Sequence, residues 1–328
     1  MNFEITSHLT RGVQTKWLEL IEAAGLIPDE KNERTLLVYD NEELVATGSR
    51  DGCVLKLIAV ADSHRGEDLT ALILTELRKD AFEDGHDHLF LYTKPQNRYT
   101  FESLFFYHVV ETPTVLVMEN KRNGLSDFLS KLPTATNAER VGAIVMNANP
   151  FTLGHRALVE RAASECDAVY VFVLSEDRSE FSAKDRIEMV RRGTCDLKNV
   201  TVLETGPYLI SSATFPTYFI KDRDSAEFAA CDIDIKIFAT KLAPRLNVTH
   251  RYVGTEPTSP LTEKYNERLK SQLPREHIEV CEIERKKNEN EPISASKVRE
   301  IIKKRDTGAL SSLLPATTLE YLKEHEFI

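Results

Sequence analysis

The amino-acid sequence predicts an α/β protein of two domains, in which an α+β domain precedes a domain built on a parallel sheet. The chain has 328 residues, which is long for one ordinary domain and comfortable for two. Strand and helix periods are mixed in residues 1–120, whereas strand alternates with helix in residues 139–328. Residues 121–138 carry turn and loop chemistry and are therefore expected to form a linker.

The elements of the first domain follow from apolar periodicity and from turn signals such as Asp51-Gly52. We expect helices at 15–24, 69–83 and 97–107, and strands at 35–40, 44–50, 54–60, 88–93 and 109–119. The linker contains a short apolar segment at 125–132 that is a further helix candidate.

The elements of the second domain alternate regularly. We expect strands at 141–146, 168–174, 200–204, 248–253 and 278–284, and helices at 154–166, 183–193, 215–220, 226–242, 261–271, 294–304 and 317–325. Such alternation predicts a parallel sheet with helices on both faces. Ligands in these sheets bind beyond the carboxyl ends of the strands.

Composition indicates a soluble globular protein, with 41% hydrophobic and 29% charged residues. The apolar runs are the length of strands and none approaches the ~18 residues of a membrane span, so no membrane partner is expected. The N-terminus lacks the basic and apolar segments of a secretory signal. Five scattered cysteines form no zinc motif, and Cys166 and Cys195 are expected to be core thiols in a reducing cytoplasm.

The formal net charge of −10 disfavours a nucleic-acid partner, which usually leaves a basic footprint. The best candidate for a local basic patch consists of Arg285, Lys286, Lys287, Lys303, Lys304 and Arg305. A solvated surface is the simpler interpretation of this patch.

The first strand of the second domain leads into a loop suited to an anion. Its sequence is Asn147, Ala148, Asn149, Pro150, Phe151, Thr152, Leu153, Gly154 and His155, and a helix follows at once. Pro150 stiffens the turn, and Gly154 lets the chain approach a phosphate without a Cβ. His155 falls in the first helical turn, where free N–H groups and the helix dipole favour an anion. His155 and the Thr152 hydroxyl are candidate donors to a phosphate in the transition state.

A second motif, Ile293 to Arg299, opens a late helix. Ser294 and Ser296 before an apolar-periodic segment are typical of an N-cap. Paired with the first motif, they and Arg299 are interpreted as a clamp on the β and γ phosphates of a nucleotide, because the arginine fork is bidentate and permanently charged. Lys184 and Arg186 lie where a loop meets a helix, and they either add charge over a triphosphate or are surface charges.

These motifs resemble the T/HxGH and ISSTxxR motifs of the cytidylyltransferase-like nucleotidyltransferases, with Thr152 at the first histidine position and Ala295 where serine is usual. A wider pattern over nearly all of 139–328 resembles the citrate lyase ligase family. It comprises residues 141–161, Phe181-Ser182-x-Lys184-Asp185-Arg186, Tyr208-x-Ile210-Ser211-Ser212-Ala213-Thr214-Phe215-Pro216, Val253-Gly254-Thr255-Glu256-Pro257 and Tyr265-Asn266. The resemblance implies a Rossmann-like domain.

It also implies an ATP-dependent ligase. Acetate would attack the α-phosphate of ATP, giving acetyl-adenylate and pyrophosphate, and the phosphoribosyl-dephospho-CoA thiol of the citrate lyase acyl carrier protein would then take the acetyl group and release AMP. His155, Thr152 and Arg299 are the expected catalytic residues. The expected nucleotide-binding residues are Asn147, Asn149, Pro150, Phe151, Gly154, Lys184, Arg186, Gly254, Glu256, Ser294 and Ser296. ATP implies Mg²⁺, which takes ligands mainly from phosphates and water, so no metal-ligating residue is expected.

Residues 1–120 resemble the GNAT acetyltransferase fold in the order of their elements and in the segments 64–68 and 97–107. Arg65 fits the GNAT phosphate loop, but Asp68 and Thr70 stand at its two glycine positions, and Asp68 would bring negative charge toward a pyrophosphate. Phe105 replaces a second common glycine. These departures favour a domain that docks or supports the carrier protein over an active acetyltransferase.

Three other functions remain open at this point. The first is an adenylyltransferase of coenzyme biosynthesis that leaves AMP on its product, and the second is an acetate-dependent ligase that modifies tRNA. The third is a non-enzymatic module that binds the carrier. The acidic balance disfavours the tRNA ligase, and two phosphate motifs disfavour the module.

Overall fold

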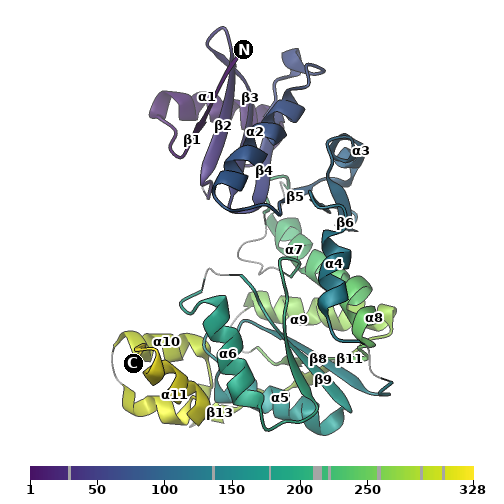
Figure 1. The fold of residues 1–328 in the computed structure, drawn as a ribbon, viewed down its shortest axis with the longest axis vertical. Helices are drawn as coiled ribbons and strands as arrows, with labels where there is room; N and C mark the ends of the chain where they lie inside the picture. The colour runs from purple at the N-terminus through teal and green to yellow at the C-terminus, as the bar shows by residue number, and fades with distance from the viewer. Residues whose placement is uncertain are drawn as a thin grey trace. The chain divides into compact units, whose positions relative to one another are not determined.

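The chain forms two compact units in a computed structural model (Figure 1). The structure describes residues 1–28, 31–134, 137–176, 179–209, 216–220, 223–256, 260–288, 291–304 and 307–328. The first unit comprises Met1–Asp127 and Ser212–Ile233, and the second comprises Phe128–Ser211 and Asp234–Ile328. The chain thus returns to the first unit at Ser212–Ile233, a segment that its sequence pattern had assigned to the second domain.

The first unit contains a mixed sheet of seven strands in the order β1-β2-β3-β4-β5-β7-β6. The strands are β1 (Asn2–Thr6), β2 (Arg34–Asp40), β3 (Glu43–Asp51), β4 (Val54–Val60), β5 (Phe90–Thr93), β6 (Tyr107–Glu111) and β7 (Leu116–Glu119). Only β4 and β5 pair in parallel, while the other neighbours are antiparallel. This mixture confirms the predicted α+β character.

Helices α1 (Arg11–Ala23) and α2 (Leu69–Glu83) cover opposite faces of this sheet. Trp17 of α1 donates from Nε1 to Thr47 Oγ1 at 3.2 Å. A Cβ built on the next residue, Gly48, would lie 2.3 Å from Ile73 of α2. Because successive residues of a strand face opposite sides, the two helices pack on different faces. The remaining helices are η1 (Asp62–His64), η2 (Pro95–Asn97), α3 (Arg98–Glu102) and α4 (Gly124–Lys131).

Three features of the first unit differ from the sequence prediction. The single strand expected at 109–119 is wrong, because the chain turns after Thr112 and its N–H donates to the Val115 carbonyl at 2.8 Å. The helix expected at 97–107 ends at Glu102, and Phe105 adopts the left-handed conformation with φ 61°. The strand β1 was not predicted, because its residues lie on an exposed edge and lack a clear apolar period.

The second unit contains a parallel sheet of five strands in the order β10-β9-β8-β11-β12, which confirms the predicted architecture. The strands are β8 (Val141–Met146), β9 (Ala168–Val173), β10 (Val200–Glu204), β11 (His250–Gly254) and β12 (Glu279–Ile283). The strand order reverses at β8, so the ends of β8 and β11 form a topological switch point. These two strands pair only through His250 with Gly142 and Arg251 with Ala143, so their ladder stops short of the carboxyl ends.

Helices cover both faces of the parallel sheet. Tyr252 donates to Glu165 at the end of α5 at 2.8 Å, whereas the guanidinium of its neighbour Arg251 stacks 4.4 Å from the Phe238 ring centre on the other face. The helix α7 (Arg223–Ile237) begins in the first unit and ends in the second. The other helices of the second unit are α5 (Leu153–Glu165), α6 (Ala183–Thr194), η3 (Phe238–Leu242), α8 (Ala243–Leu246), α9 (Pro260–Gln272), η4 (Leu273–Glu276), α10 (Ala295–Lys303), η5 (Thr307–Ser312) and α11 (Ala316–Glu324).

Two small elements complete the second unit, the short strands β13 (Lys287–Asn288) and β14 (Glu291–Pro292). The helix expected at 215–220 is wrong for 216–220, which form a turn, and Phe215 lies outside the described residues together with the family-motif residues 210–214 and Pro257. Cys166 is buried as predicted, but Cys195 at the end of α6 is exposed. Within the described ranges, no helix combines the length and apolarity that crossing a membrane requires.

Packing around Gly193 on α6 provides a test of the second unit. A Cβ at Gly193 would lie 2.4 and 2.6 Å from ring atoms of Phe151, whose side chain is fully buried. We expect Gly193→Ala to lower the free energy of unfolding by ~1–3 kcal/mol, as overpacking does. Urea unfolding followed by circular dichroism measures this. The matched helical control Gly12→Ala has nothing within 4 Å of its new Cβ and should cause no loss, and equal midpoints for the two variants would contradict the packing shown.

Candidate functional site

The side chain of Arg186, which is fully buried, holds the loop after β8 in place. Its guanidinium donates to the Asn147 carbonyl at 3.0 Å and to Asn147 Oδ1 at 2.6 Å. It also donates to the carbonyls of Leu174, Glu176 and Phe181 in the segment after β9. Arg186 therefore positions the loop, which corrects the expectation that it adds charge over a triphosphate.

Asn149 makes a second tie between the same two segments. Its side chain is buried, and Oδ1 accepts from the Phe181 N–H at 3.1 Å. The peptide bond between Asn149 and Pro150 is cis, and Ala148 before it has φ 50°. A buried polar loop needs internal partners of this kind because water cannot satisfy it. The loop thus reaches the start of α5 in a fixed conformation.

Thr152 and His155 form a capping box at the start of α5. Thr152 Oγ1 accepts from the His155 N–H at 3.3 Å, and His155 Nδ1 accepts from the Thr152 N–H at 3.1 Å. Burial, and then the positive charge of Arg285, lower the pKa of His155 to about 4. His155 is therefore neutral near pH 7. Because Nδ1 is the acceptor, the ring proton is on Nε2, which leaves Nε2–H as a donor.

In the first turn of α5, the backbone N–H of Gly154 differs from those of its two neighbours, which both donate hydrogen bonds within the protein. The Leu153 N–H donates to the Leu313 carbonyl at 2.9 Å, and the His155 N–H is used by Thr152. The Gly154 N–H has no hydrogen-bond partner among the residues that the structure describes. A Cβ on Gly154 would lie 3.5 Å from the Ile293 carbonyl oxygen, an ordinary contact, so packing does not require glycine here. The free N–H and the missing Cβ suit an anion.

The second motif lies directly against this loop, although it is distant in sequence. Arg299 of α10 donates from Nη1 to the Asn149 carbonyl at 2.6 Å and from Nη2 to Ser296 Oγ at 3.0 Å. Ser294 caps α10 by accepting from the Ser296 N–H at 3.2 Å, so the N-cap interpretation is correct for Ser294. The structure thus brings both sequence motifs to one edge of the parallel sheet.

Gly254 ends β11 at the same edge, Glu256 follows it, and Arg285 joins them from the segment after β12. The Glu256 carboxylate, only 6% exposed, forms an ion pair with the Arg285 guanidinium. Asn266 Nδ2 donates to the Gly254 carbonyl at 2.9 Å. Arg285 was grouped by sequence with a surface patch. Its place directly after a predicted strand, at the carboxyl end, was the signal that could have identified it.

The other predicted site residues divide into buried and exposed groups. Phe151 is fully buried and stacks on His155, with ring centres 5.9 Å apart, so it supports the histidine and presents no surface to a ligand. Lys184, in the first turn of α6, is exposed, and it has no ion pair among the described residues. Lys287 and Lys303 of the basic patch pair with Glu284 and Glu180, while Arg305 lies outside the described residues.

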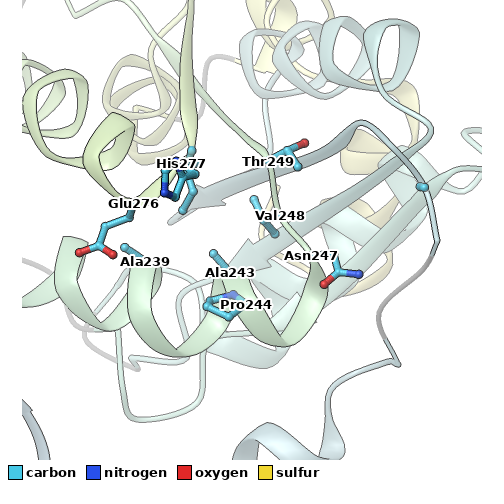
Figure 2. A pocket seen from close by; sticks show the side chains of 10 residues that line it. Ala239, Ala243, Pro244, Asn247, Val248, Thr249, Glu276 and His277 are labelled. Atoms are coloured by element: carbon cyan, nitrogen blue, oxygen red, sulfur yellow. The ribbon is translucent and has the colours of Figure 1, made fainter.

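The described part of the chain contains no group of three His, Cys, Asp or Glu side chains that could hold a metal ion. A hollow of about 410 Å³ lies at the opposite, amino-terminal edge of the parallel sheet, where Asn247, Val248 and Thr249 precede β11 (Figure 2). Its lining residues include Ala243, Pro244 and Ile278 as well as Glu276 and His277. None of the motif residues lines this hollow, so the phosphate motifs mark a different place.

Residues 141–322 match the model of the family described as the citrate lyase ligase C-terminal domain. A citrate (pro-3S)-lyase ligase of Escherichia coli K12 is 39% identical over 98% of this chain and 94% of its own length. The chain belongs to the citrate lyase ligase family. A second citrate lyase ligase, from Klebsiella pneumoniae, is 42% identical over 89% of this chain and 87% of its own. As a member of this family, the protein is an enzyme.

Among solved structures, an acyl-CoA N-acyltransferase from Pseudomonas aeruginosa is similar to part of this citrate lyase ligase, with a TM-score of 0.33 and 14% identity. The similarity covers 37% of this chain and 99% of the acyltransferase.

The ionisation of His155 can be tested directly. Long-range ¹H–¹⁵N correlation spectra should show a neutral ring protonated on Nε2 at pH 7, with a titration midpoint near 4 in place of the usual 6.5. Because the folded state binds fewer protons than the unfolded chain between these values, the free energy of unfolding should fall as the pH drops through this window. His155→Gln should remove part of that pH dependence. A midpoint above 6 would contradict the buried, capped geometry.

Proposed function

We propose that this enzyme is an ATP-dependent, AMP-forming ligase that activates acetate as acetyl-adenylate and acetylates the thiol prosthetic group of the citrate lyase acyl carrier protein. The observation that carries the proposal is the meeting of Gly154 N–H, neutral His155 and Arg299 at the switch point of a parallel sheet. Membership of the citrate lyase ligase family supports ATP, acetate and this carrier as the substrates.

The proposed first step is attack of an acetate oxygen on the α-phosphorus of ATP, with cleavage of the bond to the β-phosphate oxygen and departure of pyrophosphate. In the second step the carrier thiolate attacks the acetyl carbonyl, and AMP leaves with the electron pair of the broken C–O bond. Such transfers depend on positioning and charge stabilisation more than on proton transfer. A neutral His155 suits this role, because Nε2–H donates a hydrogen bond without giving up its proton.

The donors around His155 would hold the phosphates. The Gly154 N–H and the positive end of α5 favour one phosphate group. Arg299 is already tied to the Asn149 carbonyl, so it would reach the nucleotide from a fixed position, with Ser296 beside it. Lys184 is free to approach from α6. ATP carries Mg²⁺, and we propose that phosphate oxygens and water hold it, because no suitable cluster exists among the described side chains.

For the first unit we propose a supporting role toward the carrier protein. Asp68 adopts φ 55° at the N-cap of α2, and its side chain makes no capping hydrogen bond. Its carboxylate stands at the helix end where a CoA pyrophosphate would need positive charge. Arg65, the residue that fits the GNAT pattern, pairs with Asp62 at 2.7 Å. Both features weigh against acetyl-CoA as the acetyl source.

The proposed reaction is tested by isotope exchange. Acetate should drive exchange of labelled pyrophosphate into ATP, because adenylation is reversible before the carrier reacts. Acetylation of purified deacetylated carrier should then release AMP in equal amount. If no short carboxylate supports exchange and the enzyme transfers AMP to a pantetheine phosphate, the ligase is contradicted and the adenylyltransferase is supported. Acetate-dependent modification of tRNA would support the second alternative.

Two substitutions in the first turn of α5 test the donors. His155→Ala should lower the exchange rate by ~100-fold or more, the usual scale for one transition-state donor. Gly154→Ala should leave the unfolding midpoint unchanged and lower exchange by at least ~10-fold, because the new methyl group would lie beside the Gly154 N–H and Thr152 Oγ1, which are proposed to face a phosphate. The control His250→Ala changes a histidine at the opposite edge of the same sheet and should keep the wild-type exchange rate. If His155→Ala exchanged pyrophosphate at the wild-type rate, His155 would have no role in the mechanism.

A further inference from the structure

We propose that Arg285 is a further catalytic residue, which binds the triphosphate of ATP from the β12 side and is held in position by Glu256. The proposal rests on the ATP-dependent function proposed above and adds to it a residue that the sequence motifs leave out. Arg285 would face the phosphates opposite Arg299, so that the nucleotide lies between two arginines from different elements.

The backbone fixes the place of Arg285 at the carboxyl edge of the sheet. Gly254, the last residue of β11, is in register with Ile283, the last residue of β12. Beyond them, the Thr255 N–H donates to the Ile283 carbonyl at 2.9 Å, and the Arg285 N–H donates to Thr255 Oγ1 at 3.2 Å. The two chain segments therefore stay together past the ends of their strands, and Arg285 cannot drift away from the site.

The side chain of Arg285 runs over the end of β11 toward the switch point. Its Cγ and Nε lie 3.5 and 3.7 Å from the position that a Cβ on Gly254 would take. The adjacent strand on the other side of β11 is β8, whose loop carries His155. The lowered pKa of His155, which burial and then the positive charge of Arg285 cause, agrees with this direction of the side chain.

Glu256 holds one side of the guanidinium and leaves the rest available. The Glu256 carboxylate accepts a hydrogen bond from Arg285 Nη2. The side chain of Glu256 is 6% exposed, and that of Arg285 is 31% exposed. Nε and Nη1 of Arg285 have no hydrogen-bond partner in the part of the chain that the structure describes. A buried carboxylate that fixes one edge of a partly exposed guanidinium positions it, because the contact removes rotamer freedom before the ligand arrives.

The charges of the site point to an anion as the missing partner. Arg285 and Arg299 both lie at the carboxyl end of the parallel sheet. Arg285 pairs with the Glu256 carboxylate, whereas the partners of Arg299 in the described part of the chain are an uncharged carbonyl and a hydroxyl. The surplus positive charge matches a polyphosphate. As pyrophosphate leaves, negative charge grows on its oxygens, and a guanidinium fixed nearby stabilises that charge without reorganisation.

The test compares four variants in acetate-dependent ATP–pyrophosphate exchange. Arg285→Ala should lower the exchange rate by ~100-fold and raise the KM for ATP, while Arg285→Lys should recover part of the loss, since it restores the charge without the fork. Glu256→Gln should lower exchange by ~10-fold at an unchanged unfolding midpoint, and combining it with Arg285→Ala should add nothing. The control Arg161→Ala removes an arginine paired with Glu165 at the far end of α5 and should leave exchange unchanged.

Failure of this proposal is distinguishable from failure of the proposed function. Exchange in Arg285→Ala within about threefold of wild type would overturn the role of Arg285 and leave the ligase intact. If the wild-type enzyme exchanged with no carboxylate, the ligase would fail, and calorimetric binding of MgATP would decide on Arg285. Weakening by at least ~10-fold in Arg285→Ala would then support the contact, and equal affinity would overturn it. In the same variant the pKa of His155 should rise, since a nearby positive charge is removed.

Discussion

The hydrogen bond from the Arg299 guanidinium to the Asn149 carbonyl joins the two parts on which the site depends. It spans 150 residues of sequence and connects the loop after β8 to the first turns of α10. The Asn149 carbonyl is uncharged, so this hydrogen bond does not neutralise the guanidinium. Arg299 is therefore fixed by the protein, and no carboxylate among the described residues pairs with it. An anion that enters the site meets a donor that needs no rearrangement, and such preorganisation is what gives electrostatic stabilisation its effect.

A second arginine, Arg186, holds the loop itself, and its role is structural. Arg186 is fully buried and donates to Asn147 and to carbonyls of the segment after β9. Leaving any of these groups unpaired would cost about 1–3 kcal/mol, so the network fixes both segments together. Phe151 adds packing beneath His155, and Gly193 makes room for its ring. Arg186 thus provides structure, whereas Arg285 and Arg299 provide charge in the proposed mechanism, and burial separates the two roles.

In the first unit, Asp68 and Phe105 adopt the left-handed backbone conformation although neither is a glycine. Its mixed sheet, with α1 and α2 on opposite faces, is well packed. At the start of α2, Asp68 occupies the left-handed conformation that glycine adopts most easily. Phe105 does the same at φ 61°. At both positions the resemblance to GNAT sequences predicts glycine, so the backbone matches that expectation while the side chains depart from it.

The sequence by itself determined what local periods and short spacings encode. Alternating strands and helices fixed the parallel sheet, and Thr152 and His155 stand three residues apart, which is the spacing of a capping box. Tertiary structure decided whatever depends on distant contacts: the burial of Arg186, the meeting of Arg299 with Asn149, and the place of Arg285 beside Glu256. A charged residue looks the same in sequence whether it lies on a surface or in a site. Only the pairing of strands, which sets the residues that share an edge, distinguishes the two cases.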